Sequence, residues 1–323
     1  MVESALRRSP IVHNRADGKF GTDAARRRMT SYPDRYLGNP PVSDRAFVLL
    51  QHVLPKTLMT RAFGCLANRR LGAVTPWVIR RFIARYGVDM TEAQRQAPEA
   101  YTTFNDFFTR ALRPGARPLA SAQMICPADG AVSQFGTIAH DQIFQAKGKT
   151  FGSGALLAGD PAQASRFNDG QFATIYLSPR DYHRIHMPCD GRLRSMRHVP
   201  GALYSVNPAT ARGVDALFAR NERVVCDFDS PQGPFAMVLV GAAIVGSIAT
   251  VWHGIVNPRS GGGAAGVSTW DYAQRDVFLK QGEEMGHFQL GSTVVLLVPP
   301  GMGRFSPDWS AGCQVRMGEA MIV

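Results

Sequence analysis

The sequence predicts an α+β protein in which helices come first and a β-rich, mainly antiparallel domain follows. Apolar residues recur at helical spacing between residues 43 and 113. After Pro114-Gly115 the chain changes to short segments rich in Val, Ile, Thr and Phe, separated by Gly, Pro, Asn and Asp. The length of 323 residues and a hydrophobic content of 45% suit one large core domain with a helical appendage, and they exclude a wholly disordered chain.

Residues 1–42 are predicted to form a flexible basic arm. The arm lacks the apolar run of a signal peptide, and acidic residues interrupt its arginines, which argues against a transit peptide. Residues 1–120 carry 20 basic and 9 acidic side chains, whereas residues 121–323 carry 16 of each. The formal excess of +11 therefore lies in the first part of the chain. This asymmetry argues against a uniformly basic nucleic-acid-binding surface and favours a local anionic partner.

Residues 43–113 are predicted to contain four helices. The first is interrupted at Pro55, and the second ends near Gly72. In the third, Thr75 is the expected N-cap, Pro76 takes the first helical position and Gly87 ends the helix. The short fourth helix contains three phenylalanines, namely Phe104, Phe107 and Phe108.

Two interpretations of these helices stay open on pattern alone. Their apolar faces can pack on the protein's own core, with the arginines at a solvated rim. Alternatively, aromatic residues such as Trp77 and Tyr86 beside Arg80, Arg81 and Arg85 can form a membrane-docking surface for anionic lipid.

Residues 114–323 are predicted to be the β-rich domain. Its eighteen-residue stretch from Phe235 to Trp252 carries no charge and reaches the lower limit for a transmembrane helix. Because the stretch is rich in Val and Ile and contains Gly241 and Gly246, two buried strands fit it better, and we expect no integral membrane segment. The glycine-rich run 260–266 is predicted to be a mobile loop and not a dinucleotide-binding turn, since no helical pattern follows it.

The cysteines and histidines do not indicate a metal site. The five cysteines are scattered and none lies in a C-x-x-C pair, so a reducing compartment is the simpler interpretation. His183 and His186 are three residues apart, but no third ligand stands near them in the sequence. Their arginine neighbours, Arg180 and Arg184, suit acid–base chemistry better than cation binding.

Three segments supply the residues of a Ser-His-Asp arrangement. Ser292 follows Gly291 directly before an apolar strand, His183 and His186 lie in one short segment, and Asp129 precedes a glycine. Each has a simpler interpretation, since Gly-Ser and Asp-Gly pairs are also common in turns. Together they could provide a nucleophile, a base and a carboxylate that orients the base.

The chain closely resembles the bacterial phosphatidylserine decarboxylase proenzymes that are processed at an L-G-S-T motif. The resemblance covers roughly residues 45 to 320 and leaves out the N-terminal extension; the 260s loop also departs from the family pattern. The motifs that carry it are Phe104-Asn105-Asp106-Phe107-Phe108, Pro127-Ala128-Asp129-Gly130, Gln145-Ala146-Lys147-Gly148, Leu177 to Pro188, Val199-Pro200-Gly201, Phe218 to Arg223, Val245-Gly246-Ser247 and Leu290-Gly291-Ser292-Thr293.

The resemblance implies chemistry in two stages. First, Ser292 Oγ attacks the carbonyl of Gly291 and the peptide bond becomes an ester. β-Elimination then releases the upstream chain and leaves a dehydroalanine, which water hydrolyses to a pyruvoyl group with loss of ammonia. His186, oriented by Asp129, is the implied base. The products are a β chain, residues 1–291, and an α chain, residues 292–323. Second, the pyruvoyl group acts as the electron sink for decarboxylation, and His183 is the implied proton donor.

The resemblance also implies partners and a location. Phosphatidylserine is the substrate, no external cofactor or metal is needed, and the anionic membrane surface is a partner of the helical segment. The expected assembly is a heterodimer of α and β chains that dimerises further, bound peripherally to the cytoplasmic side of the inner membrane. The alternatives are a pyruvoyl decarboxylase of a soluble amino acid, an Asp-His-Ser peptidase and a catalytically silent lipid-binding protein.

Overall fold

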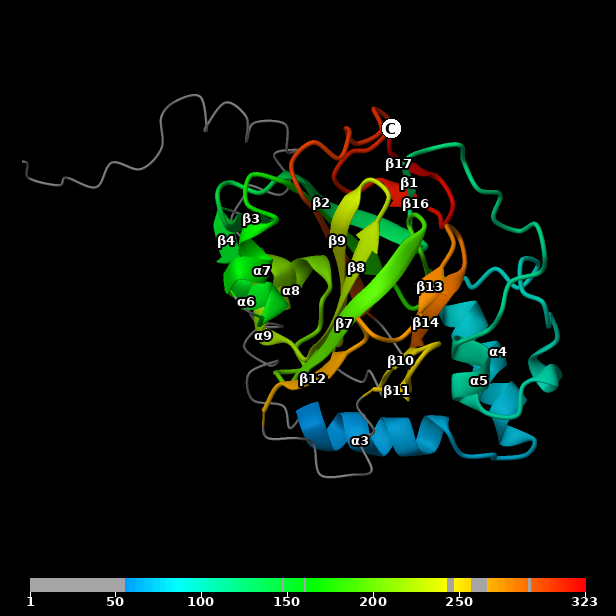
Figure 1. Ribbon diagram of the computed structural model, residues 1–323. Coiled ribbons are helices and arrows are strands. Elements are labelled where there is room, and N and C mark those ends of the chain that lie inside the picture. The colour runs from blue at the N-terminus through cyan, green and yellow to red at the C-terminus, as the bar shows by residue number, and fades with distance from the viewer. Residues whose placement is uncertain (1–55, 147, 160, 243–246, 257–265, 290–291) are drawn as a thin grey trace, which may run out of the picture.

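A computed structural model describes residues 56–146, 148–159, 161–242, 247–256, 266–289 and 292–323 (Figure 1). Its largest element is a nine-stranded sheet. In order across this sheet lie β12 (Ser268–Asp271), β7 (Gly191–Val199), β8 (Arg223–Ser230), β9 (Gly233–Val240), β15 (Ser292–Val298), β5 (Gln171–Leu177), β2 (Gly130–Thr137) and β16 (Gln314–Val315), with β13 (Phe278–Leu279) paired to β7. Every neighbouring pair in this order is antiparallel, which confirms the predicted β-rich, mainly antiparallel domain.

Smaller sheets and short helices complete the β-rich part. A four-stranded sheet has the order β11 (Gly254–Ile255), β10 (Ile248–Thr250), β14 (Glu284–Phe288) and β6 (Arg184–His186). Two further pairs are β1 (Met124–Ile125) with β17 (Ala320–Ile322), and β3 (Gln142–Ala146) with β4 (Lys149–Gly152). The short helices α6 (Ser153–Leu157), α7 (Pro161–Ser165), α8 (Pro208–Gly213) and α9 (Leu217–Arg220) lie together with β3 and β4 at one side of the large sheet (Figure 1).

Both faces of the large sheet are buried. Along β15, Val294 and Leu296 belong to one hydrophobic cluster, whereas Val295 and Leu297 belong to another. Since side chains alternate along a strand, the two clusters lie on opposite faces of the sheet. The first cluster also contains residues of the four-stranded sheet, among them Ile185, so it fills the space between the two sheets.

The uncharged stretch 235–252 forms two strands, as predicted. β9 runs to Val240 and β10 begins at Ile248, with residues 243–246 outside the described part. No described helix has both the length and the apolar character needed to cross a bilayer. Of the predicted loop 260–266, residues 260–265 lie outside the described part of the chain.

The helical segment contains α3 (Lys56–Ala67), α4 (Val74–Tyr86), the 3₁₀ turn η2 (Pro98–Ala100) and α5 (Phe104–Phe108). The expected helix before Pro55 lies outside the described residues. The predicted N-cap of the third helix was wrong: α4 begins at Val74, and Thr75 Oγ1 instead accepts a hydrogen bond from the backbone N–H of Leu71 at 3.3 Å. The predicted end was right, because Gly87 adopts the left-handed conformation with φ of 67°.

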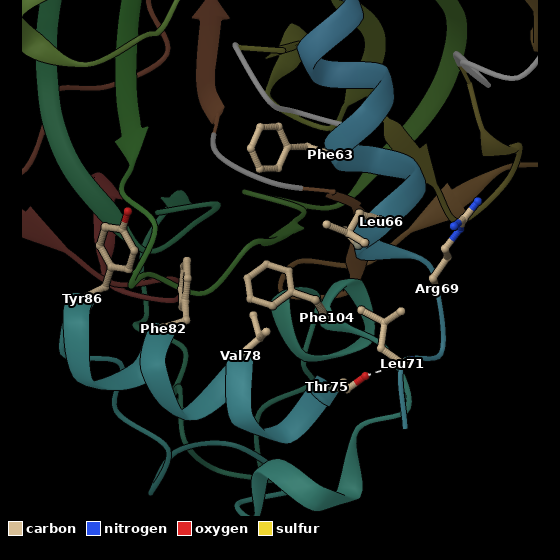
Figure 2. A pocket seen from close by; sticks show the side chains of 10 residues that line it. Phe63, Leu66, Arg69, Leu71, Thr75, Val78, Phe82, Tyr86 and Phe104 are labelled. Carbon is tan, nitrogen blue, oxygen red and sulfur yellow. Dashed lines mark hydrogen bonds between the residues drawn. The ribbon is translucent and has the colours of Figure 1, made fainter. Parts of the chain in front are cut away.

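An apolar groove of about 330 Å³ lies between α3, α4 and α5 (Figure 2). Its walls include Phe63 and Leu66 of α3, Val78 and Phe82 of α4, and Phe104 of α5. The inner side of this segment packs on itself, since a separate small cluster of buried apolar residues forms around α4 and α5. The outer side stays exposed. Membrane docking by these helices therefore remains a prediction.

Candidate active site

Ser292 is the first residue of β15, and its side chain is completely buried. By strand alternation it lies on the same face as Val294 and Leu296, toward the space between the two sheets. Within the described part of the chain its Oγ has no hydrogen-bond partner, although buried hydroxyl groups normally have one. This hydroxyl is therefore uncommitted. Gly291, the other half of the predicted cleavage site, lies outside the described residues.

The register of three adjacent strands brings Asp129 to the same edge of the sheet as Ser292. Ser292 lies opposite Leu177 in the β15–β5 pair, and Tyr176 lies opposite Ala131 in the β5–β2 pair. Asp129 directly precedes β2. The backbones of Asp129 and Ser292 are therefore separated by two strand spacings, about 10 Å, along this edge.

The loop between β5 and β6 carries His183. Asp181 holds the loop in shape, because its Oδ2 accepts hydrogen bonds from the backbone N–H and the hydroxyl of Ser178, both at 2.7 Å. His183 Nδ1 lies 2.8 Å from the backbone oxygen of Asp181. Since a carbonyl only accepts, Nδ1 carries the proton and Nε2 keeps a lone pair. Nε2 is buried and has no partner among the described residues.

The surroundings of His183 keep its ring neutral. The ring is completely buried, and the ring of Phe108 packs against it with a centroid distance of 4.1 Å. Burial lowers the pKa of His183 to about 3. At neutral pH the ring therefore offers an unprotonated nitrogen that has no partner among the described residues. The neighbouring strand β14 leads from here toward Ser292, because the N–H of Phe288 donates to the carbonyl of His183 at 3.1 Å.

Both ring nitrogens of His186 already have partners. Nδ1 lies 2.8 Å from the carbonyl oxygen of Gly282 and so carries the proton. Nε2 accepts from the hydroxyl of Tyr182 at 3.0 Å. Burial lowers the pKa of His186 and raises that of Tyr182. The backbone N–H of His186 donates to the carbonyl of Pro127 at 2.8 Å, which places β6 beside the segment that leads to Asp129.

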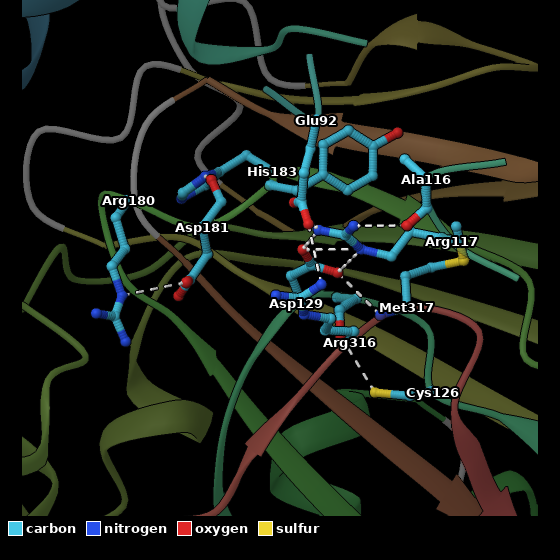
Figure 3. Close-up of polar contacts among 12 residues, drawn as sticks. Glu92, Ala116, Arg117, Cys126, Asp129, Arg180, Asp181, His183, Arg316 and Met317 are labelled. Carbon is cyan, nitrogen blue, oxygen red and sulfur yellow. Dashed lines mark hydrogen bonds and ion pairs between the residues drawn. The ribbon is translucent and has the colours of Figure 1, made fainter. Parts of the chain in front are cut away.

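Asp129 is the acceptor at the centre of a buried ion-pair network (Figure 3). Its carboxylate accepts from Arg117 Nη2 at 2.5 Å and from Arg117 Nε at 3.0 Å. It also accepts from the backbone N–H of Met317 at 2.9 Å. Arg117 Nη2 donates in addition to Glu92 at 2.6 Å. These contacts show that Asp129 does more than close a local turn.

Gly130 explains why a glycine follows Asp129. A Cβ at this position would lie 2.4 Å from the backbone oxygen of Tyr176 on the neighbouring strand β5. Only glycine allows the two backbones to approach this closely. The close approach sets the position of Asp129 relative to the strand that lies between it and Ser292.

The structure thus brings the four predicted side chains to one edge of the sheet, but it does not connect them as a hydrogen-bonded relay. The expected contact between Asp129 and His186 is replaced by Arg117 on one side and by Tyr182 on the other. The sequence did not identify Arg117 or Tyr182 as part of the site. Nothing in their spacing links them to a carboxylate or a histidine, because the contacts depend on the fold.

The described residues contain no group of three or more His, Cys, Asp and Glu side chains that could hold a metal ion. The polar groups present at the site are a hydroxyl, two neutral imidazoles and a carboxylate already paired with an arginine. Of these groups, Ser292 Oγ and His183 Nε2 are the two that have no partner among the described residues.

Comparison with known proteins gives a consistent result. Residues 104–323 match the family described as Phosphatidylserine decarboxylase, and residues 46–87 match a second family description, PSD. A phosphatidylserine decarboxylase proenzyme of Acidovorax ebreus is 64% identical over 280 residues, which cover 87% of this chain and 98% of that protein. The proenzyme of Chromobacterium violaceum is 64% identical over 281 residues, covering 87% and 99%. That of Methylibium petroleiphilum is 62% identical over 280 residues, covering 87% and 98%.

Proposed function

The chain belongs to the phosphatidylserine decarboxylase family, and we propose that it decarboxylates phosphatidylserine by means of a pyruvoyl group made from its own Ser292. The product is phosphatidylethanolamine. The group forms when the chain cuts itself between Gly291 and Ser292. The two products, residues 1–291 and 292–323, stay together because β15 pairs with β5 along its whole length and with β9 from Thr293 to Leu297.

The observation that carries this proposal is the uncommitted hydroxyl of Ser292. It is completely buried, lies at the start of a central strand and has no described hydrogen-bond partner. A buried hydroxyl without a partner costs free energy, and a chemical role is one reason for a protein to keep such a group. Here it directly follows the peptide bond that the resemblance predicts to be cut.

The hydrogen bonds favour His183 as the base that takes the proton of Ser292. His183 Nε2 has a lone pair and no described partner, whereas both nitrogens of His186 are occupied. The resemblance assigned cleavage to His186 and protonation of the product to His183. We propose that His183 serves both stages, since residue 292 is the reacting residue in each.

His186 and Asp129 act on the site through other residues in this proposal. His186 accepts a hydrogen bond from the hydroxyl of Tyr182 and so fixes the position of the tyrosine ring. Tyr182 directly precedes His183 in the sequence. Asp129 holds Arg117 and the backbone of Met317, which joins the edge of β2 to the C-terminal segment. In this proposal both residues hold the segments around the site in place.

The residues around Ser292 fit a pyruvoyl group. The group derives from Ser292 itself, whose side chain is buried and makes no competing hydrogen bond to the described residues. When formed, it supplies an electron-withdrawing ketone that takes up the electron pair left by loss of carbon dioxide. His183 can accept a proton from the substrate ammonium group and return it to the α-carbon.

Replacing Asp129 tests its positioning role. We expect Asp129→Asn to leave most of the chain uncut and to lower the free energy of unfolding by about 3 kcal/mol, because it breaks a buried ion pair with Arg117. Cleavage is measured by denaturing gel electrophoresis. Stability is measured by urea unfolding in the uncut Ser292→Ala background. As a control, Glu92→Gln removes the other carboxylate on Arg117 and should lower stability while cleavage continues. Normal cleavage in Asp129→Asn would remove Asp129 from the proposal.

We further propose that the outer side of α3 and α4 docks on the membrane. Trp77 of α4 is 59% exposed, and Leu66 of α3, which lines the groove of Figure 2, is 51% exposed. Exposed apolar surface of this kind marks an interaction site. The charge excess of the first 120 residues complements an anionic lipid surface. We propose that the protein binds peripherally to the cytoplasmic side of the inner membrane.

A flotation assay with phosphatidylglycerol vesicles tests the docking surface. We expect Trp77→Ser and Leu66→Ser each to weaken vesicle binding about 10-fold, because each removes a side chain that would be buried in lipid. Leu119→Ser is the control, since Leu119 is 48% exposed but follows the helical segment. Equal binding by all the variants would contradict docking through these helices. Tighter binding after deletion of residues 1–42 would show that the N-terminal arm competes with lipid for this surface.

Two other functions share part of the evidence. A pyruvoyl decarboxylase of a soluble amino acid would need the same Ser292 but no docking surface. Assay with phosphatidylserine and with free serine separates the two, and we expect only the lipid to be decarboxylated. An Asp-His-Ser peptidase would need a hydrogen-bonded relay, which the contacts of Asp129 and His186 do not provide. We also propose that the processed protein dimerises, in line with the resemblance.

A further inference from the structure

A polar cavity of about 310 Å³ lies beside the candidate active site. Three parts of the chain form its walls. They are the segment after α4 up to Arg117, the loop that carries Asp181 and Tyr182, and the C-terminal segment around Gln314. The cavity shares Asp129 with the ion-pair network of Figure 3. Its lining includes four arginines and four acidic residues, namely Arg110, Arg117, Arg180, Arg316, Asp89, Glu92, Asp129 and Asp181.

The acidic residues of this cavity are already committed to donors. Asp129 and Glu92 both bind Arg117. Asp181 accepts two hydrogen bonds from Ser178. Asp89 accepts hydrogen bonds from the backbone N–H and the hydroxyl of Thr91, two residues further along the chain. The carboxylates therefore offer a ligand few free acceptors.

Arg117 is fully committed, since its Nε, Nη1 and Nη2 donate to Asp129, Ala116 and Glu92, but Arg110 has donors to spare. Arg110 is only 4% exposed, and one of its nitrogens, Nη2, donates to the carbonyl of Arg180 at 3.0 Å. Its Nε and Nη1 are buried without a partner among the described residues. The side chains of Arg180 and Arg316 are more than half exposed at the rim. A buried guanidinium stays charged, and leaving its N–H groups unpaired is costly.

We propose that this cavity binds the phosphodiester group of the lipid substrate, with Arg110 as the buried recognition residue and Arg180 and Arg316 at the rim. The inference deepens the proposed function and rests on it. Spare donors on arginines require a ligand rich in acceptors, and a phosphate oxygen pair fits the fork of a guanidinium.

The substrate has two anionic groups, and the chemistry selects between them. A cation that binds the carboxylate would stabilise the ground state, because this charge disappears as carbon dioxide leaves. A cation that binds the phosphodiester does not have this effect, because the charge of the phosphodiester stays the same throughout the reaction. Arg110 Nη2 and His183 Nδ1 both donate to the backbone carbonyl of Asp181, at 3.4 and 2.8 Å, so one loop residue joins the cavity to His183. Phosphate recognition here would hold the serine part of the headgroup toward residue 292.

Calorimetric titration of the full-length Ser292→Ala chain tests the proposal without turnover. The probes are glycerophosphoserine, serine and inorganic phosphate. We expect glycerophosphoserine to bind, serine to bind at least 10-fold more weakly, and Arg110→Gln to weaken glycerophosphoserine binding about 10- to 100-fold. Arg113→Gln is the control: it removes the same charge three residues away at an exposed position outside the cavity wall.

Each other outcome overturns the proposal. Equal binding of serine and glycerophosphoserine would show that phosphate is not recognised. Binding of inorganic phosphate as tight as that of glycerophosphoserine would identify a site for free phosphate. Unchanged binding in Arg110→Gln would exclude Arg110.

A kinetic comparison covers the case in which Arg110→Gln does not fold. Arg110→Lys keeps the charge but loses the fork, so in the self-cleaving protein we expect normal cleavage and a KM for phosphatidylserine about 10-fold higher, with kcat nearly unchanged. A fall in kcat alone would indicate that Arg110 acts only by holding the loop of His183. Absence of decarboxylation in every variant, with phosphate binding intact, would contradict the proposed function and leave the binding site standing.

Discussion

Replacing Ser292 by alanine is expected to give one uncut chain of 323 residues with no decarboxylase activity. The variant lacks the only oxygen that can attack Gly291 from within residue 292, and it cannot form the pyruvoyl group. We expect activity to fall by more than about 10⁴-fold, as when a nucleophile is removed from other enzymes. Denaturing gel electrophoresis measures cleavage, and release of carbon dioxide from phosphatidylserine measures activity.

Thr293 provides the matched control for Ser292. It is the next residue of β15, it is also fully buried, and its hydroxyl also lacks a partner within the described chain. By strand alternation it points to the opposite face of the sheet, where Val295 and Leu297 lie. We expect Thr293→Val to cleave normally, because it removes a hydroxyl of the same kind from the wrong face. Cleavage of Ser292→Ala at the usual place would refute the mechanism.

Replacing His183 by alanine is expected to slow self-cleavage by about 10²- to 10⁴-fold, the usual contribution of a general base. The reason is the lone pair on Nε2, which has no partner among the described residues. Because Nδ1 donates its proton to the Asp181 carbonyl, Nε2 is the nitrogen that can accept a proton. The rate is measured by following the appearance of the 32-residue fragment after synthesis of the chain in a cell-free system.

His186→Ala separates the two possible assignments. If His183 is the base, His186→Ala should lower the cleavage rate much less, because His186 acts through Tyr182. Tyr182→Phe should then reproduce the effect of His186→Ala. If His186→Ala stops cleavage while His183→Ala cuts normally, the division of roles implied by the sequence resemblance is the correct one.

Much of the fold could be predicted from local sequence patterns. The change of character after Pro114, the two strands in 235–252 and the end of α4 at Gly87 all follow from short-range rules on β propensity and on glycine. The start of α4 could not be predicted in the same way. The favourable N-cap at Thr75 was overridden when the preceding turn joined the helix and the Thr75 hydroxyl received a bond from Leu71.

The site could be predicted as a set of residues but not as a set of contacts. The predicted site residues come from three segments that are more than 50 residues from one another in the sequence: one contains Asp129, one contains both histidines and one contains Ser292. Their proximity depends on the order β2-β5-β15, which no local pattern specifies. The partners Arg117, for Asp129, and Tyr182, for His186, also follow from packing. Sequence spacing therefore suggested a relay where the structure shows an ion pair and a separate tyrosine contact.

The central claim is that the chain converts its own Ser292 into a pyruvoyl group, and the intact mass of the purified wild-type protein tests it most directly. We predict two masses, one for residues 1–291 ending in a normal carboxyl group and one for residues 292–323. The smaller mass should be lower by one ammonia than the mass calculated for a fragment with an N-terminal serine. A single mass for the whole chain, or a small fragment that still carries its serine amine, would contradict the claim.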